Sequence, residues 1–195
     1  MKNIKTPIVV VGQNVEDYSC VYHDDYGATY SVVEKLIKDN YKQIGYIGIK
    51  DEDIAVGFER RRGYLEALRD NAISVNESIM KKGDFSAESG YEQCKNIFDT
   101  KANVEAIICA TDNMAIGAME YIKEINLNIP KDIGVVSIGD SKLSRVVTPK
   151  LSTVHYYYKT SGIEAAKVMI EKIKKENKNI TKIRLGYEFK ERESI

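Results

Sequence analysis

The sequence predicts an α/β fold, in which a parallel sheet is flanked by helices on both faces. Two observations lead to this prediction. Short apolar runs rich in β-branched residues alternate with longer segments whose apolar residues recur every three or four positions. Turn-forming residues, among them Pro130 and Pro149, fall between these segments. Because a strand, a helix and a second parallel strand form a right-handed crossover, repeated alternation builds one parallel sheet.

The individual elements follow from the same patterns. Buried strands are predicted over 8–11, 20–22, 44–49, 79–82, 106–109, 133–138 and 152–154. Helices are predicted over 26–40, 58–70, 86–99, 112–126 and 159–176. Ser86 or Ser89 is expected to cap the third helix, and Asp112 is expected to complement the dipole at the start of the fourth.

Composition excludes several classes of protein. The 195 residues are 43% hydrophobic and 30% charged, enough for one sizeable core or two smaller ones. The 29 Lys and Arg residues balance 29 Asp and Glu residues, whereas duplex binding needs an excess of cations. No apolar run approaches the roughly 20 residues of a membrane helix, and the amino terminus lacks the apolar stretch of a signal peptide. We therefore expect a cytoplasmic protein that contacts no membrane and does not bind nucleic acid by itself.

The cysteines and histidines indicate neither a cofactor nor a metal site. Cys20, Cys94 and Cys109 are odd in number and widely spaced, which favours free thiols in a reducing cytoplasm. Cys94 and Cys109 fall on predicted core faces and should be inert. His23 and Asp25 point to the same side of a strand, but two ligands make a poor metal site.

Functional side chains are expected in the loops that follow the strands, since ligands of open α/β sheets bind beyond the carboxyl ends of the strands. These loops contain carboxylates, an arginine cluster, amides, hydroxyls and aromatic rings, and they span 23–25, 50–60, 83–85, 111–113, 139–141 and 155–157. Aromatic faces stack on the C–H patches of a sugar ring, while directed donors and acceptors bind its hydroxyls. The loops therefore predict a sugar site.

Catalysis has little support in the sequence, and we expect that the protein is not an enzyme. It contains no G-x-S-x-G, P-loop, G-x-G-x-x-G or H-E-x-x-H motif. Asp24, Asp25, Asp112 and Asp140 all lie on the candidate loops, so a carboxylate pair that cleaves a glycoside remains an alternative.

A series of short motifs occurs in a characteristic order along nearly the whole chain. They are 6–12 (TPIVVVG), 23–28 (HDDYGA), Arg60 before 63–64 (GY), 83–91 (GDFSAESGY), 109–118 (CATDNMAIGA), 129–133 (IPKDI), 149–154 (PKLSTV) and 192–194 (RES). Together they resemble the LacI/GalR family of bacterial transcriptional repressors. The resemblance implies a periplasmic-binding-protein-like, flavodoxin-like core preceded by a helix-turn-helix DNA-binding head.

The same resemblance implies a domain organisation in which the DNA-binding head is absent. Residues 1–22 would be a remnant of the amino-terminal core subdomain, and 23–153 the carboxy-terminal effector-binding subdomain. Residues 154–178 would form the crossover helix of the amino-terminal subdomain, and 179–195 a terminal strand that returns to the core. We therefore expect an excised fragment that binds sugar weakly and does not bind operator DNA.

The resemblance also assigns roles to two residues. Arg60 matches the effector-binding arginine, whose planar guanidinium suits vicinal hydroxyls or phosphate. Phe85 matches the aromatic residue that stacks on the ligand, although packing in the core is the alternative. The neighbouring Arg61 and Arg62 are expected to form only a solvated helix face.

The chain departs from the family pattern at other site positions. Thr111 stands where an asparagine is usual, so a hydroxyl replaces an amide. Glycine occupies the usual carboxylate position before Asp140, which would have to substitute for it, and Tyr156 replaces a common glutamine. Asp24 is a further ligand candidate, while Asp25 either caps the following helix or joins the site.

The resemblance implies the sugar-binding and dimerisation domain of a LacI-family regulator, active as a homodimer that reaches operator DNA through its missing head. The motifs CATD and GDS, together with 22–28, resemble the sucrose and trehalose repressors most. We therefore expect a disaccharide or its phosphate as effector. The alternative is a sugar-binding protein of a transport system with the same fold.

Overall fold

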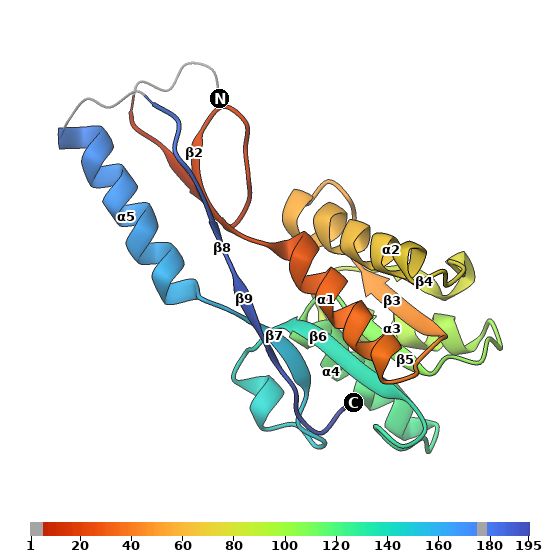
Figure 1. Cartoon of the computed structure of the whole chain (residues 1–195). Coiled ribbons are helices and arrows are strands. Elements are labelled where there is room, and N and C mark those ends of the chain that lie inside the picture. The colour runs from red at the N-terminus through yellow and green to blue at the C-terminus, as the bar shows by residue number, and fades with distance from the viewer. Residues whose placement is uncertain (1–5, 175–178) are drawn as a thin grey trace. The chain divides into compact units, whose positions relative to one another are not determined.

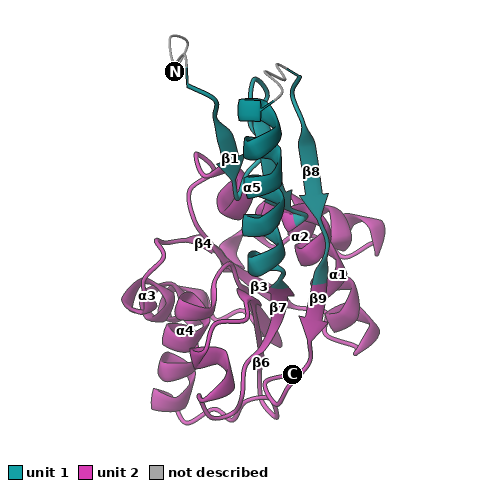
Figure 2. Ribbon diagram, turned by 90° about the vertical axis from the view of Figure 1, so that its left-hand side faces the viewer, with its two compact units in different colours: residues 1–24, 156–187 teal, residues 25–155, 188–195 magenta. Residues whose placement is uncertain are grey.

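The computed structural model describes residues 6–174 and 179–195, and the chain forms two compact units (Figure 2). Unit 1 comprises Met1–Asp24 and Tyr156–Tyr187, and unit 2 comprises Asp25–His155 and Glu188–Ile195. Residues 1–5 of the expected segment 1–22, and 175–178 of the segment 154–178, lie outside the described residues.

Unit 2 is built on the larger sheet, whose strand order is β4-β3-β5-β6-β7-β9. All pairs from β4 through β7 are parallel. The strands are β3 (Ile44–Gly48), β4 (Met80–Lys82), β5 (Ala106–Cys109), β6 (Gly134–Gly139), β7 (Ser152–Tyr156) and β9 (Tyr187–Lys190). The predicted fold class, a parallel sheet flanked by helices, is confirmed.

Two pairs of helices cover the faces of this sheet (Figure 1). On one face α1 (Asp25–Lys38) packs against α2 (Arg60–Asp70), and on the other α3 (Ala87–Phe98) packs against α4 (Asp112–Glu124). Successive residues of a strand face opposite sides, so in β3 Tyr46 stacks on Tyr64 of α2 while Ile47 joins the core beneath α3 and α4.

Glycines allow α3 and α4 to approach each other closely. A Cβ added at Gly90 would lie 2.1 Å from the carbonyl oxygen of Met114, and one at Gly117 would lie 1.8 Å from that of Ala87. Both distances are far below a van der Waals contact, so the two helix backbones touch at these positions.

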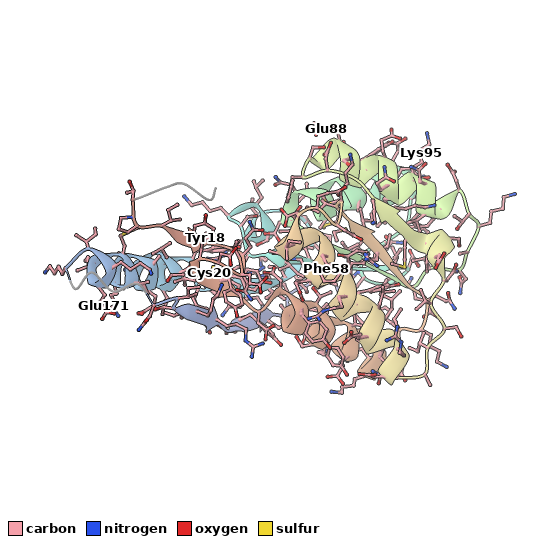
Figure 3. All side chains as sticks on the ribbon, turned by 90° about the horizontal axis from the view of Figure 1, so that it is seen from above. Tyr18, Cys20, Phe58, Glu88, Lys95 and Glu171 are labelled. Carbon is pink, nitrogen blue, oxygen red and sulfur yellow. The ribbon has the colours of Figure 1, made fainter. Side chains whose placement is uncertain are left out.

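Unit 1 contains a smaller parallel sheet and one helix. Its strands are β1 (Val9–Val11), β2 (Ser19–His23) and β8 (Lys182–Leu185), in the order β1-β2-β8. Helix α5 (Tyr158–Lys174) packs against β1 and β2. Cys20 is fully buried in this unit, and its thiol donates a hydrogen bond to the carbonyl of Tyr18, which lies beside it in Figure 3.

The structure differs from the sequence predictions at three places. A π-helical segment, Ile54–Glu59, precedes α2 where a loop was expected. Residues 77–79 form a 3₁₀ turn, so β4 begins at Met80. The segment 179–195, expected to contain one terminal strand that returns to the core, contains two strands, β8 and β9, which belong to different sheets. No helix in the described part of the chain is long and apolar enough to cross a membrane.

Candidate functional site

Four of the six residues predicted to bind ligand lie at the carboxyl edge of the sheet of unit 2. Arg60, Phe85, Thr111 and Asp140 follow β3, β4, β5 and β6, respectively. Because these strands are parallel, their carboxyl ends lie at one edge, where ligands of such sheets bind. Asp24 and Tyr156 belong to unit 1.

Arg60 is the most firmly held of these residues. Its Nε and Nη2 atoms lie 2.7 and 2.6 Å from Oδ1 of Asp25, and its Nη1 donates to the carbonyl of Ala110. Both side chains of the ion pair are buried, with 8% of Arg60 and 5% of Asp25 exposed. The guanidinium is therefore fixed between the start of α1 and the end of β5. Asp25, which the sequence left open between a capping and a site role, holds this arginine.

The π-helical segment before α2 directs Arg60 toward the sheet edge. The carboxylate of Asp53 accepts the backbone N–H of Val56 at 2.8 Å and so begins the segment. Only glycine fits at position 57, because a Cβ there would lie 2.0 Å from the carbonyl oxygen of Lys50. A π-helical turn of this kind is often found at functional sites.

Phe58, an aromatic residue at this edge, is not among the predicted site residues. It lies on the segment that leads into α2 (Figure 3), two residues before Arg60, and 38% of it is exposed. The sequence does contain a signal for this residue, because Phe58 is a large apolar residue within the loop 50–60, which follows a predicted strand.

Phe85 projects from a rigid turn between β4 and α3. The carboxylate of Asp84 accepts hydrogen bonds from the backbone and hydroxyl of Ser86, and these bonds lower the pKa of Asp84. Ser86 then caps α3 by accepting the N–H of Ser89 at 3.1 Å, which confirms the first of the two predicted caps. Phe85 itself is 50% exposed and does not pack in the core. A rigid turn that presents an exposed ring suits stacking on a ligand.

The hydroxyl of Thr111 forms a hydrogen bond within the protein. Thr111 is the N-cap of α4 and accepts the N–H of Met114 at 3.4 Å. This long bond leaves the hydroxyl only weakly committed, since N–H···O bonds are commonly near 2.9 Å.

Asp112, expected at the start of the fourth helix to complement its dipole, also joins three segments of the sheet edge. Its Oδ1 accepts the hydroxyls of Ser137 and Thr153, at 2.5 and 2.8 Å, and its Oδ2 accepts the N–H of Ser141 at 2.5 Å. Asp112 is only 4% exposed, and both of its carboxylate oxygens accept hydrogen bonds from the protein. It therefore orders the loop that contains Asp140.

Asp140 is surrounded by basic side chains, two of them arginines. Its Oδ2 lies 2.7 Å from Nη2 of Arg145 and 3.0 Å from Nδ1 of His155, and its Oδ1 lies 2.5 Å from Nη2 of Arg192. Burial alone would raise the pKa of this carboxyl, but the hydrogen bonds and charges of Arg145 and Arg192 outweigh it and lower the pKa to about 2. A ligand hydroxyl would have to compete with these protein donors for the carboxylate.

The two candidates in unit 1 take part in contacts of their own. The ring of Tyr156 is 1% exposed and stacks on His23, with centroids 4.5 Å apart and planes 8° from parallel. Tyr158 meets both rings edge-on. The carboxylate of Asp24 lies 3.6 Å from Nη1 of Arg184.

Residues 6–174 and 179–195 bring together no group of three or more His, Cys, Asp or Glu side chains that could hold a metal ion. The edge instead presents guanidinium, hydroxyl and aromatic groups. Such a set binds a polar organic molecule through directed hydrogen bonds and stacking.

The chain as a whole is similar to bacterial transcriptional regulators. The HTH-type transcriptional repressor PurR of Pectobacterium carotovorum subsp. carotovorum (strain PC1) is 31% identical over 183 residues, which cover 91% of this chain and 53% of that protein. The structure of a transcriptional regulator CelR–cellobiose complex superposes with a TM-score of 0.91 at 26% identity, over 96% of this chain and 58% of that one. A regulatory protein of the LacI family from Chloroflexus aggregans superposes with a TM-score of 0.89 at 25% identity, over 96% and 68%.

These relatives are transcriptional regulators and not enzymes. The chain spans about half the length of the curated relatives that it matches. The family described as periplasmic binding protein-like domain matches residues 33–195. The chain therefore belongs to the periplasmic binding protein-like domain family.

Proposed function

We propose that this chain is the effector-binding domain of a LacI-family transcriptional regulator and that its effector is a sugar. The observation that carries the proposal is the buried, doubly anchored guanidinium of Arg60 at the carboxyl edge of the sheet. A guanidinium held in one orientation binds vicinal hydroxyls or a phosphate without the entropic cost of ordering a long side chain. The exposed ring of Phe85, at the same edge, suits the apolar face of a pyranose.

A disaccharide of the sucrose or trehalose type, free or phosphorylated, is the effector that we favour. The motifs at 109–112 and 139–141 support this choice, and the CelR relative was solved as a complex with cellobiose. In the whole regulator the sugar would shift a two-state equilibrium by its differential affinity for the two states, and operator affinity would change with it. Operator binding would require a helix-turn-helix head, and we expect the regulator to act as a homodimer.

A transport-linked sugar-binding protein remains the rival function. The relatives named above are regulators, which favours the regulatory function. The coding sequence upstream of this chain separates the two, because a regulator has a helix-turn-helix segment there and an exported protein has a signal peptide.

A thermal-shift series tests the class of effector. The probes are sucrose, trehalose, the 6-phosphate of each and cellobiose, with hypoxanthine and arginine as non-sugar probes. A sugar at about 100 times its Kd adds about 2.7 kcal/mol to the free energy of unfolding, which raises Tm by about 5 °C or more in a chain of this size. The sugar assignment is wrong if hypoxanthine or arginine raises Tm and none of the sugars does.

A further inference from the structure

Tyr46 is a buried tyrosine at the centre of β3 that the site described above does not use. Only 1% of it is exposed, and its ring stacks on that of Tyr64 from α2, with centroids 4.9 Å apart and planes 26° from parallel. The ring therefore lies on the α2 side of the sheet.

The hydroxyl of Tyr46 points toward the carboxyl edge. A Cβ built at Gly48 would lie 2.4 Å from Cε1 of Tyr46 and 3.2 Å from its hydroxyl oxygen, so the ring runs along the strand and over Gly48. Gly48 is the last residue of β3, and Arg60 begins α2 at the same edge. Burial raises the pKa of Tyr46, and the positive charges of Arg60 and Arg61 oppose that rise, as expected for a hydroxyl near both guanidinium groups.

This hydroxyl has no hydrogen-bond partner among the residues that the structure describes, although it is fully covered. Its neighbour Tyr64 differs, because the Tyr64 hydroxyl donates to the carbonyl of Ile44 at 2.7 Å. An unsatisfied buried hydroxyl is unfavourable, and native proteins rarely keep one without a reason. Phenylalanine would fill the same space without this cost.

We propose that Tyr46 is a specificity-determining residue of the effector site. When a sugar binds at Arg60, the residues that bury the Tyr46 hydroxyl shift. The hydroxyl then gains a hydrogen bond to a sugar hydroxyl. This inference rests on the proposed function, since it names the polyol as the partner that the hydroxyl lacks.

The energetic consequence is a preference for the bound state. The unsatisfied hydroxyl destabilises the sugar-free protein, and the sugar removes that cost when it supplies the partner. A contact present only in the bound state contributes its full free energy to the shift between states. A ligand without a suitably placed hydroxyl gains nothing from Tyr46, so the residue selects for polyols.

The test compares Tyr46→Phe with Tyr64→Phe in the 195-residue chain. The two rings stack on each other, and each variant removes one hydroxyl, so the pair is matched in size and burial. Without sugar, Tyr46→Phe should melt at or above the wild-type temperature, whereas Tyr64→Phe should melt below it. With sucrose, trehalose and cellobiose as probes in NMR titrations, Tyr46→Phe should weaken the binding of whichever sugar the wild type binds by about 5- to 10-fold. Tyr64→Phe should leave that Kd within about 2-fold.

The outcomes separate this inference from the proposed function. If the wild type binds one of the three sugars and Tyr46→Phe binds it equally well, the inference is overturned and the proposed function stands. The inference is also overturned if Tyr46→Phe melts below the wild type without sugar, because the hydroxyl then has a partner in the free protein. If the wild type binds none of the three sugars, the failure lies in the proposed function, and the inference falls with it.

Discussion

Arg60 and Asp25 form a buried ion pair across 35 residues of sequence, with Nη2 of the arginine 2.6 Å from Oδ1 of the aspartate. The pair joins the first residue of α2 to the first residue of α1. The same guanidinium donates to the carbonyl of Ala110, directly before the cap of α4. One side chain thus connects three helix starts at the carboxyl edge of the sheet.

Removing the carboxylate of this pair should be costly. In Asp25→Asn the buried guanidinium loses its counter-charge, and we expect the free energy of unfolding to fall by about 3 kcal/mol. Urea denaturation measures this loss. The control is Asp51→Asn, because Asp51 pairs with Arg61 in a partly exposed site, where the expected loss is under about 1 kcal/mol. Equal losses in the two variants would show that Asp25 does not stabilise the buried guanidinium of Arg60.

The cluster around Asp140 should make stability depend on acidic pH. The folded state lowers the pKa of Asp140 to about 2, while an unfolded aspartate titrates near 3.9. A lowered pKa contributes stability that is present above the unfolded value and is lost as pH falls through the folded value. The free energy of unfolding should therefore decrease between about pH 4 and pH 2.

Asp140→Asn should lower the free energy of unfolding at pH 7 by about 3 kcal/mol, and it should remove this part of the acid dependence. Urea denaturation at pH 7 and at steps between pH 4 and pH 2.5 measures both effects. Asp39→Asn serves as the control, since Asp39 pairs with Lys35 at the surface. An unchanged pH dependence in Asp140→Asn would contradict the assignment of the acid-sensitive group.

The close approach of α3 and α4 predicts that their glycines cannot be enlarged. Gly117→Ala would place a methyl group against the carbonyl of Ala87, and we expect a loss of about 2 kcal/mol or more. Gly162→Ala is the matched control, because nothing lies within 4 Å of a Cβ at this position in α5. There the better helix propensity of alanine should add about 0.5–1 kcal/mol. Thermal melts that rank the two variants in the opposite order would refute the described contact.

The cysteines should be unreactive in the folded protein. Cys20, Cys94 and Cys109 are buried, and burial raises the pKa of Cys94 and of Cys109, so little thiolate forms near neutral pH. Iodoacetamide at pH 8 should label all three thiols in guanidinium chloride and none at a comparable rate in buffer. Rapid labelling of the native protein would mean that a thiol lies closer to the surface than the structure places it.

The regular part of the fold could be predicted from sequence because its apolar periods are clear. The strand 106–109 has the predicted bounds, and the helices around 26–40 and 112–126 begin within one residue of the predicted start. The π-helical segment Ile54–Glu59 could not be predicted, because its close approach to Lys50 depends on tertiary contact at Gly57. The segment Lys182–Leu185 alternates exposed and half-buried residues and lacks the apolar run that marks a buried strand.

The sequence could predict which loops contain the site residues, but it could not predict the ion-pair and hydrogen-bond partners of those residues. The rule that ligands bind beyond the strand ends selected the loops of Arg60, Phe85, Thr111 and Asp140. It could not show that Asp140 faces two guanidinium groups, because Arg192 lies 52 residues further along the chain. Likewise, the partners of Asp112 come from β6, β7 and the loop after β6, and only the folded sheet brings them together.

The central claim is that Arg60 binds a sugar effector, and calorimetric titration of Arg60→Lys tests it most directly. Lysine keeps a positive charge for Asp25 but loses the planar fork. With the sugar that gives the largest thermal shift, we expect at least a 10-fold weaker Kd for Arg60→Lys and a wild-type Kd for the control Arg61→Lys. A wild-type Kd for Arg60→Lys would contradict the account.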